Sequence, residues 1–76
     1  MTETEWLYLF GRNLTQMIYS YGMTQKELAD ATGLSTASIN AYINGRKMPG
    51  VKALINISYV LNCTIDELVD FGEKVR

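Results

Sequence analysis

The sequence predicts an all-α fold, a compact bundle of five short helices around one hydrophobic core. Apolar residues recur at three- and four-residue steps over most of its 76 positions, which is the period of a helix with one buried face. Three threonines each stand three residues before a glutamate, the spacing of a helix-capping box. Glycine or asparagine follows the periodic stretches, where helices commonly end in a left-handed residue. At this length we expect a single domain covering residues 1–76.

The first helix is predicted over residues 3–21. Thr2 and Glu5 have the spacing of a capping box at its start, and Gly22 stops it. Gly11 lies inside this helix, where glycine costs about 1 kcal/mol relative to alanine. A close packing contact would explain this glycine, which the sequence alone does not decide. The residues expected on the apolar face are Leu7, Phe10, Leu14, Met17, Ile18 and Tyr21.

Three more apolar residues of this helix, Trp6, Tyr8 and Leu9, fall partly off that face. We expect these side chains to pack at the edge of the core, because single apolar side chains are common at protein surfaces and do not by themselves indicate a binding site. A partner-binding surface is the alternative.

The second and third helices are predicted over residues 25–32 and 36–43, inside a motif that spans about 24–45. A capping box opens the second helix, Gly33 turns the chain, and Ser35 caps the third helix. Helices this short are marginal in isolation, so tertiary packing must hold them. The side chains expected to face a shared core are Leu28, Thr32, Leu34, Ile39 and Tyr42, with the small Ala29 where the two helices cross.

Residues 44–50 are predicted to form an exposed loop, because two basic residues and the Pro49-Gly50 pair are typical of turns. The fourth helix is predicted over residues 51–61, with apolar residues that extend beyond its inner stripe. That inner stripe comprises Val51, Leu54, Ile57, Ser58 and Leu61.

The fifth helix is predicted to begin after Thr64, which has capping-box spacing with Glu67, and to end at Gly72. Asp66 and Glu67 suit the positive end of the helix dipole, so we interpret them as caps rather than as a catalytic carboxylate pair. Residues 72–76 are expected to form a frayed tail. The side chains expected to complete the core are Leu68, Val69 and Phe71.

Composition argues against several classes of function. The chain has one cysteine, Cys63, and no histidine, so we expect no internal disulfide, no metal site and no nucleophile–imidazole pair. Neither an acid–base pair nor a phosphate-cradling glycine loop is visible, so we expect no enzyme, cofactor or small-molecule ligand. The acidic N-terminus and the lack of a long apolar run predict no signal peptide, no membrane segment and a cytoplasmic location.

The charges are distributed unevenly. A formal net charge of −1 argues mildly against a nucleic-acid binder, but such binding requires a basic patch rather than a basic whole. Most acidic residues lie near the chain ends, while most cations lie within the motif or just after it. Those cations are Lys26, Arg46, Lys47 and Lys52.

Small, apolar and amide residues follow one another in a fixed order through the motif and the helices after it. They are Gln25, Leu28-Ala29, Gly33-Leu34-Ser35, Ile39, Asn44-Gly45 and Pro49, then Leu54, Ile57, Leu61, Ile65 and Leu68. In this order the motif is a helix-turn-helix, and residues 8–71 resemble the phage repressor and Cro family, the XRE-type transcriptional regulators. The resemblance implies a lambda-repressor-like domain that binds double-stranded DNA sequence-specifically and regulates transcription, as a repressor.

In that family the second helix of the motif enters the major groove with its N-terminus first. The resemblance therefore implies base contacts by the outer residues of the helix that starts near Thr36, and phosphate contacts by the residues around it. The expected base contacts are Thr36, Ala37, Ser38, Asn40 and Ala41, with Asn40 suited to an adenine edge. The expected phosphate contacts are Gln25, Lys26, Asn44, Arg46 and Lys47.

The sequence departs from the family pattern in two ways. Thr36 and Ala37 are short where many relatives carry glutamine, arginine or lysine, which implies modest specificity or a site read partly through DNA shape. Relatives often pair an arginine of the first helix with a glutamate of the third. Here Ile18 and Ile43 take those positions, and we expect their side chains to touch.

Relatives bind as pairs on half-sites about 34–36 Å apart, which implies a homodimer on DNA. The candidate dimer contacts are Ile55, Tyr59, Val60 and Phe71, with core edge or scattered surface positions as the alternative. The competing hypothesis for the whole chain is a protein-interaction module on the same fold, such as an antitoxin or an adapter. The acidic charge balance favours that hypothesis.

Overall fold

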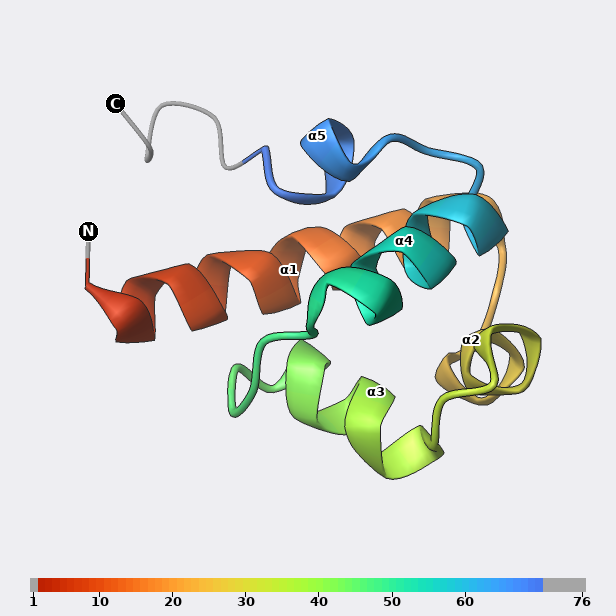
Figure 1. The fold of residues 1–76 in the computed structure, drawn as a ribbon, viewed down its shortest axis with the longest axis horizontal. Coiled ribbons are helices and arrows are strands. Elements are labelled where there is room, and N and C mark those ends of the chain that lie inside the picture. Colours follow the sequence, from red (N-terminus) through yellow and green to blue (C-terminus); the bar gives the residue numbers. More distant parts are fainter. Residues whose placement is uncertain (1, 71–76) are drawn as a thin grey trace.

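The structure, a computed structural model, describes residues 2–70 of the chain. Over this range it contains five α-helices and no strand, which confirms the expected all-α class (Figure 1). Three helices have the predicted bounds, and the last two end earlier than predicted. The helices are α1 (Glu3–Tyr21), α2 (Gln25–Thr32), α3 (Thr36–Ile43), α4 (Val51–Val60) and α5 (Ile65–Leu68).

All three predicted capping boxes are formed. At the start of α2, the Thr24 hydroxyl accepts the Glu27 N–H at 3.1 Å and the Glu27 carboxylate accepts the Thr24 N–H at 2.9 Å. The same reciprocal pair opens α1 at Thr2 and α5 at Thr64, and the Ser35 hydroxyl caps α3. These side chains satisfy N–H groups that the first turn of a helix leaves without an internal partner.

The longest helix, α1, organises the other four. In Figure 1, α3 lies on one side of α1 and α5 on the other, and both pack against it. The short helix α2 packs against α3 and α4, and α4 packs against α5. The pair α2 and α3 therefore forms one edge of the bundle, where an outer face of α3 stays in contact with solvent.

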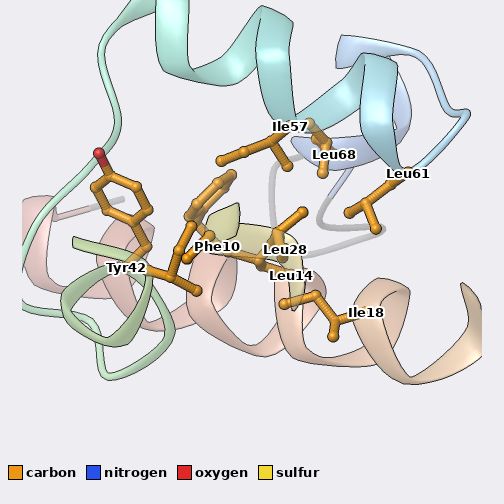
Figure 2. Close-up of a cluster of buried hydrophobic side chains, with 10 residues drawn as sticks. Phe10, Leu14, Ile18, Leu28, Tyr42, Ile57, Leu61 and Leu68 are labelled. Atoms are coloured by element: carbon orange, nitrogen blue, oxygen red, sulfur yellow. The ribbon is translucent and has the colours of Figure 1, made fainter. Parts of the chain in front are cut away.

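The hydrophobic core is built on one face of α1. In Figure 2, Phe10 and Leu14 lie at the centre of the cluster, with Ile57 and Leu68 on one side of them and Ile18 on another. All five side chains are buried, four of them completely. Complete burial of such a side chain stabilises a fold by roughly 1.5–3 kcal/mol, so this cluster accounts for much of the attraction between helices.

The inward face of the helix-turn-helix is as predicted. Leu28 and Ile39 are fully buried, and Tyr42 is 4% exposed. Ala29 is also buried, as expected of a small residue where α2 meets α3. Thr32 is buried too, and its hydroxyl donates to the Leu28 carbonyl oxygen at 2.8 Å, so its burial leaves no polar group without a partner.

Three predictions of burial are wrong. Tyr21 and Val51, both expected to face the core, are 51% and 71% exposed. They are the last residue of α1 and the first residue of α4, where the neighbouring helices no longer cover the apolar face. Pro49, expected in an exposed loop, is buried, while its neighbour Gly50 is exposed and forms the N-cap of α4.

The outer apolar residues near the start of α1 behave differently from one another. Leu9 packs against the core cluster, as the core-edge interpretation requires. Tyr8 is 59% exposed, and the Arg12 guanidinium lies over its ring at 5.8 Å from the centroid. Trp6 is 37% exposed, less than Tyr8.

The fourth helix ends at Val60 rather than at Leu61, and α5 ends at Leu68 rather than at Gly72. At the end of α5, a side chain from α1 bonds to the last carbonyls. The Asn13 amide donates to the carbonyl oxygens of Glu67, at 2.9 Å, and Leu68. Carbonyls at a helix C-terminus need donors from outside the helix ladder, and Asn13 supplies one here. Phe71, Gly72 and the predicted tail lie outside the described residues.

Gly11 allows α1 and α3 to approach closely. A Cβ atom at this position would lie 2.9 Å from the Tyr42 carbonyl oxygen and nearer still to the Ile43 carbonyl oxygen. Both atoms belong to the backbone at the end of α3, so a side-chain rotation cannot make room. The structure thus supplies the packing reason for this glycine that the sequence left open, and it fixes where α3 sits on α1.

Candidate nucleic-acid interface

The outer face of α3 is exposed at its start and bears no charge. Thr36 and Ala37 are exposed, and the side chains one turn later, Asn40 and Ala41, are half-buried. Ser38 is also half-buried, and its hydroxyl accepts from the Ser35 hydroxyl at 3.0 Å. The first turn of α3 therefore presents small, uncharged side chains to solvent.

Exposed cations precede and follow this neutral helix in the chain. Lys26 lies in the first turn of α2, Arg46 and Lys47 follow α3, and Lys52 lies in the first turn of α4; all four side chains are exposed. The acids Glu27 and Asp30 lie on α2, so the positive charge is densest in the loop after α3. An uncharged helix face flanked in the chain by exposed cations suits a polyanion such as duplex DNA.

The turn after α3 folds the chain back over the helix. Gly45 adopts a left-handed backbone with φ +71°, and its N–H donates to the Tyr42 carbonyl oxygen at 3.2 Å. The Arg46 N–H donates to the Ala41 carbonyl oxygen at 2.9 Å. These two bonds form the Schellman motif that ends many helices, and they set the direction in which the Arg46 side chain leaves the backbone.

A hydrogen-bond network joins the start of α2, the middle of α3 and this turn. The Asn40 side-chain oxygen accepts from Arg46 Nη2 at 2.9 Å and from Asn44 Nδ2 at 3.0 Å. Asn44 Nδ2 also donates to the Asn40 carbonyl oxygen at 2.9 Å. On its other side, Asn40 Nδ2 donates to Gln25 Oε1 in a long bond of 3.5 Å.

Sequence reasoning placed these four residues on the interface but missed the network. The spacing of Asn40 and Asn44 is the one signal that was available, since residues four apart share a helix face. The Arg46 contact depends on the left-handed turn, and the Gln25 contact depends on how α2 meets α3. Neither could be read from periodicity.

Ile18 and Ile43, which the resemblance aligns with an ion pair found in many relatives, face the same hollow in the structure. Both line one shallow, largely apolar hollow between the end of α1, the start of α2 and the end of α3. Ile18 is buried, and Ile43 is half-buried against the core cluster. The replacement of charges by apolar side chains is consistent with this environment, since a buried pair can be exchanged for packing without loss of stability.

Comparison with known proteins decides the family. Residues 17–68 match the family described as helix-turn-helix, which is more than half of the chain. The chain belongs to the XRE-type helix-turn-helix family. This confirms the resemblance inferred from the order of residues in the motif.

Two proteins similar to this helix-turn-helix chain help to place it. The HTH-type transcriptional regulator YqaE of Bacillus subtilis is 35% identical over 69 residues, which is 88% of this chain. The aligned part is 60% of the length of YqaE, so the chain spans less than two thirds of that relative. The crystal structure of the restriction-modification controller protein C.AhdI from Aeromonas hydrophila superposes with a TM-score of 0.78 at 22% identity. The superposition covers 82% of this chain and 94% of the C.AhdI chain, which shows a shared fold.

A second exposed surface of the helix-turn-helix chain lies on α4. Val51, Ile55 and Tyr59 recur every four residues and are 71%, 50% and 85% exposed, so they form one apolar stripe. Val60, proposed with Ile55 and Tyr59 as a dimer contact, is half-buried and packs against the core cluster instead. Phe71, the fourth candidate, lies outside the described residues.

Other kinds of site find little support in the part of the chain that the structure describes. No group of three or more histidine, cysteine, aspartate or glutamate residues between positions 2 and 70 is arranged to hold a metal ion. In the same range, every helix is too short or too polar to cross a bilayer. Partial burial and the Glu67 carboxylate raise the pKa of the Cys63 thiol above its ordinary value of 9.0, which keeps it protonated at neutral pH.

Proposed function

We propose that the chain is a sequence-specific DNA-binding transcriptional regulator whose helix α3 enters the major groove. The observation that carries this proposal is the exposed, uncharged first turn of α3, flanked in the chain by four exposed cations. Family membership and the description of YqaE as an HTH-type transcriptional regulator support it. An α-helix fits the major groove of B-DNA, where each base pair presents a distinct set of donors, acceptors and methyl groups.

The chain has two kinds of contact available for this binding. On α3, the hydroxyls of Thr36 and Ser38 can bond to bases or phosphates, and Ala37 and Ala41 can pack against thymine methyl groups. Asn40 lies at the centre of the same face. The residues proposed for phosphates, which orient the protein without reading sequence, are Gln25, Lys26, Asn44, Arg46 and Lys47.

We propose that two copies bind together as a homodimer. The chain measures 33 Å along its longest axis, and half-sites for this motif lie about 34–36 Å apart, so one copy cannot place a recognition helix in both half-sites. The stripe of Val51, Ile55 and Tyr59 on α4 offers an apolar contact of the kind that an interface core uses. A dimer that covers a promoter would act as a repressor in the cytoplasm, where bacterial or phage DNA is transcribed.

A salt titration of binding to random duplex DNA tests the proposal. Each phosphate neutralised makes log K fall with log salt at a slope of about −0.9. Lys47→Ala should reduce that slope by about 1 and weaken all sequences alike. Arg12→Ala is the matched control, because it removes an exposed cation that lies over the Tyr8 ring on α1 and is not among the proposed phosphate contacts.

A slope near zero, or no binding at low salt, would overturn the proposal. That result would favour the protein-interaction module, which the net charge of −1 and the exposed apolar stripe on α4 support. Selection of bound sequences from a random duplex pool would then return no consensus. With the proposed function, the same selection yields an operator with two related halves.

A further inference from the structure

The face of α3 that is proposed to enter the groove carries few groups able to discriminate bases strongly. The best-discriminating contacts in a major groove are bidentate pairs, above all a guanidinium with the O6 and N7 atoms of guanine. Thr36, Ala37 and Ala41 are too small for such a pair, and α3 itself has no charged residue. Apart from Asn40, a strong base contact must therefore come from a side chain that reaches this face from outside α3.

Arg46 is such a side chain. It follows α3 in the chain, but the left-handed Gly45 turns it back, and its Nη2 atom lies 2.9 Å from the Asn40 side-chain oxygen in the middle of the helix. Asn40 lies four residues after the exposed Thr36, which puts both on one face of α3. The guanidinium is thus held beside the outer face of the recognition helix instead of extending from the loop.

The hydrogen bonds also define what Asn40 can do. Its side-chain oxygen has two lone pairs, and it accepts from both Arg46 and Asn44. Reading adenine would need this oxygen to accept from the adenine amino group while the amide nitrogen donates to N7. In this arrangement the oxygen is occupied, whereas a guanidinium has five N–H donors, and the bond to Asn40 leaves enough of them for a guanine edge.

We propose that Arg46 reads a guanine in the major groove and that Asn40 is the positioning residue that holds its guanidinium there. This inference rests on the proposed function, and it gives Arg46 a base contact in place of a phosphate contact. Asn44 secures the arrangement by bonding to both oxygens of Asn40. The orientation of Arg46 is established before DNA is bound, which reduces the ordering that binding requires.

The experiment begins with selection of a consensus site by the wild-type chain. The consensus should contain one guanine in each half whose replacement by adenine weakens wild-type binding by about 5- to 150-fold, the range for a good bidentate pair. Replacing that guanine with 7-deazaguanine, which lacks the N7 acceptor but still pairs with cytosine, should also weaken binding. In Arg46→Ala both losses should disappear, while Lys47→Ala should keep both.

Asn40→Ala separates positioning from direct reading. It should reduce the preference for that same guanine, and in the Arg46→Ala background it should have no further effect at that position. A purely structural role for Asn40 would lower the thermal midpoint and weaken all sequences alike, without changing the preference at one base. Thermal unfolding of each variant, followed by circular dichroism, therefore accompanies the binding measurements.

Three outcomes would overturn the inference while leaving the proposed function intact. The first is a consensus without a guanine whose preference depends on Arg46. The second is an Arg46→Ala variant that loses affinity equally for all sequences, as loss of a phosphate contact would cause. The third is a preference for adenine that is lost in Asn40→Ala but kept in Arg46→Ala. If the wild-type chain bound no duplex DNA at low salt, the proposed function would fail, and the inference would fail with it.

Discussion

Replacing Gly11 with alanine tests how closely α1 and α3 approach. The new methyl group would lie 2.9 Å from the Tyr42 carbonyl oxygen and nearer still to that of Ile43, whereas ordinary contacts begin at 3.4 Å. The two helices must therefore separate by about 0.5 Å or more, because neither carbonyl can rotate away. Movement of Tyr42 would also disturb its hydrogen bond with the Gly45 N–H, which helps to form the turn after α3.

Two opposing effects decide how much Gly11→Ala changes the unfolding free energy. Alanine inside a helix is favoured over glycine by about 1 kcal/mol. Overpacking of a tight contact costs about 1–3 kcal/mol, and sometimes more. Since the clash here is with backbone at two atoms, we expect the upper part of that range and a net loss of about 1–2 kcal/mol. For a domain of this size that loss lowers the thermal midpoint by about 5–15 °C.

The assay is urea unfolding followed by circular dichroism. The urea midpoint should fall, while m, the slope of the unfolding free energy against urea concentration, should stay constant if the folded and unfolded states keep their compactness. Gln16→Ala, an exposed change on the same helix, is the control and should stay within about 0.5 kcal/mol of wild type. A Gly11→Ala variant as stable as wild type, or more stable, would show that helix propensity outweighs the contact. The packing explanation for this glycine would then be wrong.

Three further predictions concern single elements of the fold. Thr24→Ala removes the capping box of α2 and should lower the unfolding free energy by about 0.5–2 kcal/mol, whereas Thr4→Ala, an exposed change inside α1, should have little effect in the same urea assay. Gly50→Ser should stabilise the chain by about 0.5–1 kcal/mol, because Gly50 provides no side-chain cap and a Cβ there meets no atom within 4 Å. The measurement is the thermal midpoint, which should rise, and an unchanged midpoint would mean that the new hydroxyl does not cap α4. Because the folded state raises the pKa of Cys63 above 9.0, stability should fall as pH rises through the raised value, and Cys63→Ser should show a smaller fall when urea midpoints below and above pH 9.0 are compared.

The start of each helix was predictable because its causes are local. The three Thr–Glu capping boxes act over three residues, so their spacing alone located the starts of α1, α2 and α5. The apolar periodicity likewise identified Phe10, Leu14, Leu28, Ile39 and Ile57 as core residues. A periodic pattern shows which side of a helix is apolar, but it does not show how far the neighbouring helices extend along that side. This is why Tyr21 and Val51 were wrongly placed in the core.

The same distinction between local causes and long-range contacts applies to the interface. The sequence identified the outer residues of α3 and the cations near it, because helical spacing and the order of the motif depend on residues close together in the chain. Only the tertiary structure joined them, since Arg46 reaches Asn40 through a left-handed turn and Gln25 reaches it from another helix. The same holds for Asn13, which bonds to the Glu67 carbonyl at the end of α5 across 54 residues of chain. Local sequence thus determined the helices and their apolar faces, while contacts between distant residues decided how far those faces are covered and how the polar groups of the interface are paired.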